Sequence, residues 1–338
     1  MFGSPRARSP FAGFWCSRSV VRLLAGLFVL LVVSTCGPAP PAPPERAFYH
    51  WQTQFDVPPE LLLENDATRV YVKAFDVSWE DGRATPSAVL QVKRKTRADY
   101  VPVIFLTNEV FTHPTDSLAP RMLRLLDRSF PFPYTELQID CDWTAGTRAT
   151  YFAFLKTLRQ LRPRLTLSCT VRLHQYRDRP QQGIPPVDRA VLMAYNTGDL
   201  GRWETKNSIV DSTIIAGYVR GQPPYPLPLD LAVAAYDWAA VYRHGQLAYL
   251  INEPGLEELA DTSRFTLLAP LRYRVQQGTY YENLYLYPGD LIRREIITRP
   301  EAERLVAWLW PQVATRGSKY AIVYRVNSRQ WVSPLPPP

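Results

Sequence analysis

The chain has 338 residues, with 39 Lys and Arg against 31 Asp and Glu and a formal net charge of +8. Four of these positive charges are arginines within the first 22 residues, so the rest carries only about +4 and its basic residues are scattered. The sequence contains no nucleic-acid-binding motif, no glycine-rich phosphate loop and no His/Cys cluster with zinc spacing. We therefore predict no nucleic-acid partner, no cofactor and no metal.

The first residues predict export. A basic start is followed by an unbroken apolar run, Leu23–Val33, and by small residues before Cys36. This pattern is typical of a secretory signal, and the run is too short for a comfortable membrane span of about 20 residues. Because a cysteine ends it, segment 1–36 resembles a bacterial lipoprotein signal peptide, which implies that Cys36 carries lipid. A plain signal peptide cut nearby is the alternative.

A proline-rich spacer occupies residues 37–46, and such linkers are extended at about 3 Å per residue. An anchor followed by a spacer is what a tethered domain outside the cytoplasm needs. We expect a protein of the bacterial cell envelope, held at the membrane through Cys36. The remaining segment, 47–338, has the length of a single α/β barrel domain.

Short apolar strands recur along this domain. The predicted strands are Ala47–Gln54, Arg69–Val77, Val101–Asn108, Thr135–Asp142, Arg164–Leu173, Asp188–Tyr195, Leu229–Tyr236 and Tyr320–Val326. Helical patterns lie between several of them, at Ser117–Ser129 and Thr147–Leu161, and a capping box at Thr298 opens a helix that ends near Gln312.

Strands that alternate with helices predict an α/β fold, a (β/α)₈ TIM barrel, with an open doubly wound sheet as the alternative. In the second crossover, Ala88–Lys95 fits a strand as well as a helix. The region of about 262–297 is rich in Tyr and Leu and predicts a β-hairpin-like insertion before the last helix and strand.

Polar residues gather where the predicted strands end, which in such a barrel is where functional residues lie. They are Asp76, Asn108, Glu109, Asp140, Asp142, Arg172, His174, Tyr195, Asn196, Tyr236 and Asp237. The most informative strand carries two of them: since side chains alternate along a strand, Asp140 and Asp142 point to one side. By the same alternation Cys141 and Cys169 face the helices, where we predict buried free thiols rather than a disulfide.

Two segments carry a family resemblance. Leu137-Gln-Ile-Asp-Cys-Asp-Trp-Thr144 resembles the Asp-x-x-Asp-x-Asp-x-Glu strand of the family-eighteen glycoside hydrolases, the chitinases and related enzymes. Val187–Asn196 resembles the sixth strand of that family, which ends Met-x-Tyr-Asp. The resemblance implies that Asp142 orients the acetamido group of the substrate, that Asp140 supports it and that Tyr195 assists. It also implies a carbohydrate ligand, and uncharacterised bacterial lipoproteins with chitinase-like barrels would share these features.

The segment that resembles the family's catalytic strand lacks the catalytic acid. Thr144 occupies the position of the closing glutamate. Its hydroxyl does not ionise near neutral pH, so it cannot act as a general acid. Acids at other strand ends, Glu109, Asp76 and Asp237, are the candidates to replace it. For the aspartate pair itself, the alternative to a ligand or catalytic role is a structural pair bonded to Arg172 or Tyr195.

The remaining candidate ligand contacts are aromatic or polar residues at strand ends, since flat rings with a polar edge suit a sugar face. They are Trp51, Asp76, Trp143, Arg172, Asn196, Tyr236 and Asp237. The sequence thus leaves three functions open: a tethered glycan-active enzyme whose acid comes from another strand, a sugar-binding barrel without catalysis, and a structural envelope protein with a vestigial pocket.

Overall fold

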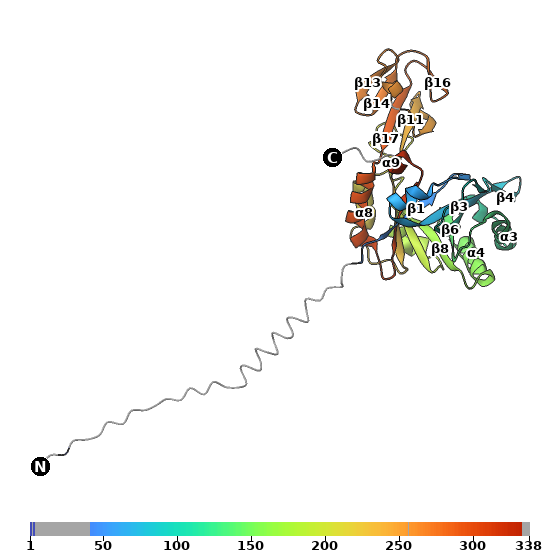
Figure 1. Cartoon of the computed structure of the whole chain (residues 1–338), viewed down its shortest axis with the longest axis vertical. Coiled ribbons are helices and arrows are strands. Elements are labelled where there is room, and N and C mark those ends of the chain that lie inside the picture. Colours follow the sequence, from blue (N-terminus) through green and yellow to red (C-terminus); the bar gives the residue numbers. More distant parts are fainter. Residues whose placement is uncertain (2, 4–40, 256, 333–338) are drawn as a thin grey trace. The chain divides into compact units, whose positions relative to one another are not determined.

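We analysed a computed structural model of the chain, which describes residues 1, 3, 41–255 and 257–332 (Figure 1). Of the predicted signal peptide only residues 1 and 3 are described; its apolar run, Cys36 and residues 37–40 of the spacer lie outside the described residues. Within the described ranges, no helix has both the length and the apolar character needed to cross a membrane.

A closed barrel of eight parallel strands forms the centre of the fold. Its order is β1-β3-β6-β7-β8-β9-β10-β18, and β18 pairs in parallel with β1 to close it. The strands are β1 Glu45–His50, β3 Ala67–Glu80, β6 Asp99–Leu106, β7 Glu136–Cys141, β8 Thr166–Arg172, β9 Arg189–Met193, β10 Leu229–Ala234 and β18 Tyr320–Tyr324. All eight predicted strands are confirmed. Their near-continuous apolar runs suit strands that are buried on both faces.

Helices cover the outside of the barrel. They are α2 Pro59–Glu64, α3 Leu118–Ser129, α4 Arg148–Leu161, α5 Leu173–Arg177, α6 Arg179–Gln182, α7 Ser212–Val219, α8 Arg299–Val313 and α9 Arg329–Val332, with 3-10 turns η1 Asn108–Thr112 and η2 Glu257–Ala260. The three predicted helices correspond to α3, α4 and α8. The predicted capping box opens α8, since the backbone and hydroxyl of Thr298 both donate to Glu301, at 2.8 and 2.7 Å.

The second crossover is built from strands. Strand β3 extends beyond the barrel and pairs antiparallel with β4, Arg83–Ser87. The ambiguous segment 88–95 contains only the two-residue strand β5, Gln91–Val92, which pairs with β2, Gln54–Phe55. Residues 88–95 therefore follow the strand interpretation.

The antiparallel insertion is larger than the predicted region of about 262–297, since it begins at Asp237. Its five-stranded sheet has the order β12-β11-β17-β14-β13, and β15 pairs with β16. The strands are β11 Asp237–Arg243, β12 Gln246–Asn252, β13 Phe265–Ala269, β14 Arg272–Val275, β15 Thr279–Tyr281, β16 Leu284–Leu286 and β17 Leu291–Ile296. A turn at His244-Gly245, with φ values of 51° and 77°, connects β11 to β12 in the manner of a type I′ hairpin.

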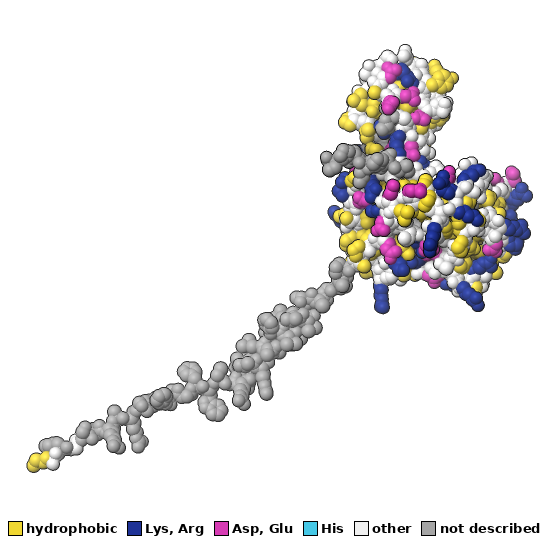
Figure 2. Space-filling model, viewed as in Figure 1, with side chains coloured by type: hydrophobic (Ala, Val, Ile, Leu, Met, Phe, Trp, Pro, Cys, Tyr) yellow, Lys and Arg dark blue, Asp and Glu magenta, His cyan; other side chains and the backbone are white. Residues whose placement is uncertain are grey.

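The insertion has an apolar cluster of its own, which includes Val241, Phe265, Tyr281 and Ile292. The main core lies inside and around the barrel, and Cys141 and Cys169 belong to it as buried free cysteines, as predicted. On the visible face, Lys and Arg side chains are interspersed with Asp and Glu (Figure 2). This agrees with the scattered charge of the sequence.

Candidate functional site at the barrel mouth

The carboxyl ends of the barrel strands bring the two sequence-predicted aspartates to one side. Asp140 is the penultimate residue of β7 and is only 2% exposed. Its carboxylate accepts a hydrogen bond of 2.5 Å from the hydroxyl of Thr170 on the neighbouring strand β8. Asp142 follows β7 at the mouth itself, where its side chain is 45% exposed.

A bidentate ion pair fixes Asp142. The guanidinium of Arg172, at the end of β8, donates from Nε to Oδ1 at 2.5 Å and from a terminal nitrogen to Oδ2 at 2.9 Å. Planar fork-to-fork pairing is the geometry that Arg favours with a carboxylate. Both carboxylate oxygens of Asp142 are therefore engaged, and their orientation is set by Arg172.

The surroundings of Asp140 raise the pKa of its carboxyl group. Burial raises the pKa of its carboxyl to about 6; the nearby Arg172 lowers that pKa and the neighbouring Asp142 raises it. Near pH 6 the group therefore exchanges a proton, although its burial keeps it from direct contact with solvent.

A cavity of about 330 Å³ opens beside the ion pair. Its lining residues come from β8, β9 and the segments that follow β7, β8 and β9: Asp142, Arg172, Leu173, His174, Met193, Tyr195, Asn196, Thr197 and Tyr218. Asp142 is the sole carboxylate in this lining among the described residues. Burial lowers the pKa of His174.

Tyr195 offers the cavity an unused hydrogen-bonding group. The residue is buried, and within the described part of the chain its hydroxyl has no partner. Its ring stacks on that of Tyr324 at the end of β18, with centroids 5.4 Å apart. Burial raises the pKa of Tyr195 well above its usual range, so the hydroxyl stays protonated and can donate.

The opposite part of the mouth is aromatic and carries a lysine. Trp51 lies edge-on to Tyr324 with centroids 6.0 Å apart, and the Nζ of Lys73 lies 5.7 Å from the centre of the Trp51 ring. Lys73 donates to Asp76 at 2.8 Å, while the other oxygen of Asp76 is buried without a partner among the described groups. Lys73 and Tyr324 were absent from the predicted site. The alternation of Arg69, Tyr71 and Lys73 along one strand was the signal for the lysine.

Asn196 and Tyr236 are also at the mouth and contact one another. The hydroxyl of Tyr236 donates to Asn196 at 3.0 Å, and the Tyr236 ring lies 5.6 Å from that of Tyr324. Asn196 is exposed and adopts a positive φ of 54°, a conformation that Asn tolerates better than most residues. Its side chain is thus presented at the cavity.

Two predicted contacts have structural roles instead. Asp237 is fully buried and forms ion pairs with Arg329, at 2.8 Å from Nε, and with Arg294, at 3.6 Å, so its charge is already compensated. Trp143 is also fully buried; it stacks on Tyr151 at 5.2 Å and donates to the carbonyl of Gln182. Trp143 therefore packs in the core and does not line the mouth cavity.

The position of the missing acid is occupied by a small hydrogen-bond network. Thr144 is exposed, and its backbone N–H donates to the hydroxyl of Thr147, which in turn donates to Asn108 at 2.5 Å. Glu109, on η1 beside Asn108, is exposed and has no ion pair within residues 41–332. Across the described residues, no three His, Cys, Asp or Glu side chains are placed to hold a metal ion.

Comparisons with known proteins identify the fold. No family model matches the sequence, and no curated protein matches it. Among solved structures, a chitinase from Chromobacterium violaceum is similar, with a TM-score of 0.51 and 11% identity over 86% of this chain and 97% of that one. The spore cortex-lytic enzyme SleL from Bacillus cereus gives a TM-score of 0.49 and 14% identity over 86% of this chain and 73% of that one. By its fold, the chain is a chitinase-like (β/α)₈ barrel.

Proposed function

We propose that this protein is a glycan-binding barrel of the cell envelope that recognises a carbohydrate at its mouth without efficient hydrolysis. The observation that carries the proposal concerns two residues that follow strand β7, Asp142 and Thr144. Asp142 is held in a bidentate pair by Arg172, and a threonine stands two residues further on, at position 144.

Binding is supported by the composition of the mouth. Sugar rings need flat apolar faces and fixed polar groups, and small-molecule sites typically combine the two in a cavity of about 300–1,000 Å³. Here Trp51 and Tyr324 supply aromatic surface, while Tyr195 and Asn196 supply hydrogen-bonding groups. The chitinase-like fold and the resemblance of the acidic strand favour an N-acetylated oligosaccharide as the ligand.

Efficient hydrolysis is disfavoured for a chemical reason. A positioned general acid contributes about 10²–10⁴ in rate, and the Thr144 hydroxyl cannot supply it. Asp140 has a suitable pKa, about 6, but its side chain is buried and bonded to Thr170. Asp142 cannot turn toward a substrate unless it leaves Arg172.

The envelope location rests on the sequence. A lipid on Cys36 and the proline-rich segment after it would hold the barrel near a membrane surface. The substitution Cys36→Ser should release the protein from the membrane fraction or stall its processing. Unchanged processing and fractionation of that variant would contradict this part of the proposal.

Calorimetry with chito-oligosaccharides, combined with a hydrolysis assay, tests the glycan proposal. We expect wild-type protein to bind, and Tyr195→Phe to bind about tenfold more weakly because the donor is lost. A matched control is Tyr280→Phe, which removes a hydroxyl from an exposed ring of the insertion. Hydrolysis by the wild type that Asp142→Asn abolishes would instead establish an enzyme, and absence of binding to any glycan would leave a structural protein.

A further inference from the structure

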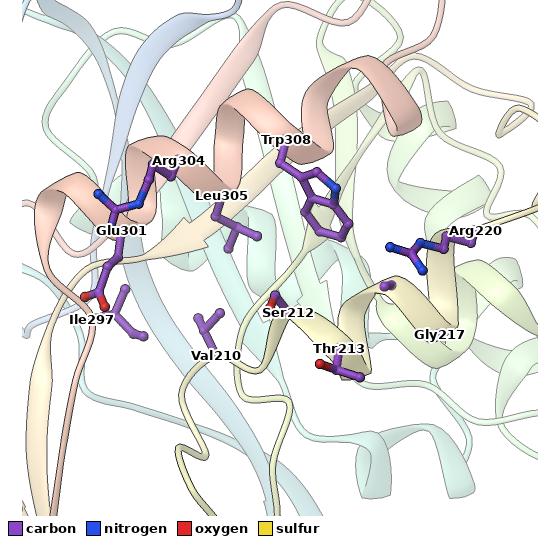
Figure 3. Close-up of a pocket in the computed structure, with 11 residues that line it drawn as sticks. Val210, Ser212, Thr213, Gly217, Arg220, Ile297, Glu301, Arg304, Leu305 and Trp308 are labelled. Atoms are coloured by element: carbon purple, nitrogen blue, oxygen red, sulfur yellow. The ribbon is translucent and has the colours of Figure 1, made fainter. Parts of the chain in front are cut away.

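A second cavity lies outside the barrel, between α7 and α8, and its volume of about 830 Å³ is more than twice that of the mouth cavity (Figure 3). We call it the interhelix groove and define it by Ala216, Gly217 and Arg220 of the α7 side and Arg304, Leu305 and Trp308 of α8. It shares no lining residue with the mouth cavity. A Cβ atom built on Gly217 would meet nothing within 4 Å, so this wall of the groove is open backbone.

Two arginines mark the ends of the groove. Arg304 and Arg220 lie at opposite ends in the close-up view, with Trp308 between them (Figure 3). Both are exposed, and neither guanidinium has an ion pair or hydrogen bond within the described ranges. The one acid in the lining, Glu301, already accepts two hydrogen bonds from Thr298 at the start of α8. Because these donors are neutral groups, Glu301 keeps its negative charge, and the lining carries two positive charges, on Arg220 and Arg304, against one negative charge.

Trp308 adds a flat surface to this charge. Its ring is only partly buried, and in the described structure it stacks on no other aromatic ring and lies beneath no cation. Ser212 and Thr213 add two exposed hydroxyls on the opposite side of the groove. Indole faces suit the apolar face of a sugar, and hydroxyls suit its rim.

From this combination we propose that the interhelix groove is a second, separate binding site, and that its ligand is an anionic glycan, a sugar chain that carries carboxylate groups. Arg220 and Arg304 bind carboxylates of the chain, and Trp308 packs against a ring between them. Guanidinium groups bind such anions in a bidentate manner. The proposal does not depend on a ligand at the barrel mouth.

An acidic peptide fits the groove less well. A helical peptide needs a continuous apolar groove, whereas this one has Ser212, Thr213 and open backbone on its α7 side. An extended peptide needs a free sheet edge, and both walls here are helices. A neutral sugar would leave both arginines without partners.

Binding of the purified full chain to three probes tests the proposal: hyaluronan oligosaccharides, which are carboxylated, chitohexaose, which is neutral, and poly-glutamate as an acidic peptide. We expect hyaluronan to bind, and the double variant Arg220→Gln/Arg304→Gln to weaken its binding by about tenfold or more. Trp308→Ala should weaken it by about fivefold. The matched control Arg83→Gln/Arg316→Gln removes the same charge from two exposed arginines outside the groove and should change the Kd by less than about twofold.

Thermal melts must first show that each variant is folded. Loss of hyaluronan binding in the groove variants alone, with Tyr195→Phe unaffected, supports the second site. The proposal is overturned if no hyaluronan binds, if the control double variant loses as much affinity, or if Tyr195→Phe abolishes binding, which would assign the ligand to the mouth. Tighter binding of poly-glutamate that also needs Trp308 would assign the groove to an acidic peptide.

Discussion

The two ends of the same barrel differ in how the oxygens of their carboxylates are satisfied. At the amino-terminal end, each oxygen of two buried carboxylates has a donor. Glu136 accepts from Arg69 at 2.5 Å and Ser168 at 2.6 Å. Asp230 accepts from Arg189 at 2.6 Å and from the backbone of Lys319 and Tyr320.

At the mouth, by contrast, a carboxylate oxygen is left over. The hydroxyl of Tyr195 and one oxygen of Asp76 are buried without partners among the described groups. Unpaired buried polar groups are unfavourable for folding, and at the amino-terminal end the unpaired atoms among the described groups are Arg69 Nε and the hydroxyl of Tyr71 rather than a carboxylate oxygen. The difference is therefore one of charge compensation: both buried acids of the amino-terminal end are fully paired, whereas Asp76 at the mouth keeps a free acceptor, as the glycan site that we propose there requires.

The largest expected contrast is in stability. Asp230→Ala leaves Arg189 and two backbone N–H groups without their acceptor in a fully buried site, and we expect a loss of about 3–5 kcal/mol in the free energy of unfolding. Asp142→Ala at the half-exposed mouth should cost less than about 1 kcal/mol. Urea denaturation of the two variants measures both values, and equal losses would contradict the division between the ends.

The second contrast concerns catalysis at the mouth. Thr144→Glu places a carboxylic acid two residues beyond Asp142, and we expect hydrolysis of a chito-oligosaccharide to rise by a factor of about 10² over the wild type. Thr144→Gln has nearly the same shape without the acid and should remain at the wild-type level. If Glu and Gln variants are equally inactive, the Arg172 pair rather than the missing acid prevents catalysis.

The third contrast is a pH dependence of stability. The folded pKa of Asp140, about 6, is above the unfolded value of about 3.9, so the folded state binds the proton more tightly. This contribution to stability is complete below pH 4 and is lost as the pH rises through 6, with a total of about 2–3 kcal/mol. The difference in unfolding free energy between wild type and Asp140→Asn, measured from pH 4 to 7, should follow this direction. A flat difference would show that the pKa of Asp140 is not raised.

The barrel could be predicted because its strands are continuous apolar runs separated by clear helical patterns. The start of the insertion could not, since Leu229–Arg243 contains no Gly or Pro to mark the break between β10 and β11. The aspartate pair followed from alternation. By the same rule Trp143 points to the same side as Cys141, toward the helices, and this accounts for the burial of Trp143.

Contacts between distant segments were beyond the sequence pattern. Alternation places Asp142 and Arg172 on the inner side of adjacent strands, but it does not state that they form a bidentate pair rather than binding a ligand separately. Alternation from Arg69 and Tyr71 indicates the inner face for Lys73, but Lys73 and Asp76 would point to opposite faces of a regular strand. Their contact at 2.8 Å follows a β-bulge between Lys73 and Phe75, which the sequence pattern did not show.

The buried ion pair of Asp237 with Arg329 has a consequence for how the chain can be shortened. Asp237 opens the first strand of the insertion, and Arg329 also donates to the carbonyl of Pro254, just after β12. A chain that ended before Arg329 would therefore lose the clamp at the root of the insertion, more than 70 residues away in sequence. The same trimming would also remove Trp331, which is buried against Phe48 of β1 with ring centroids 5.3 Å apart, so it should loosen both the insertion and this side of the barrel.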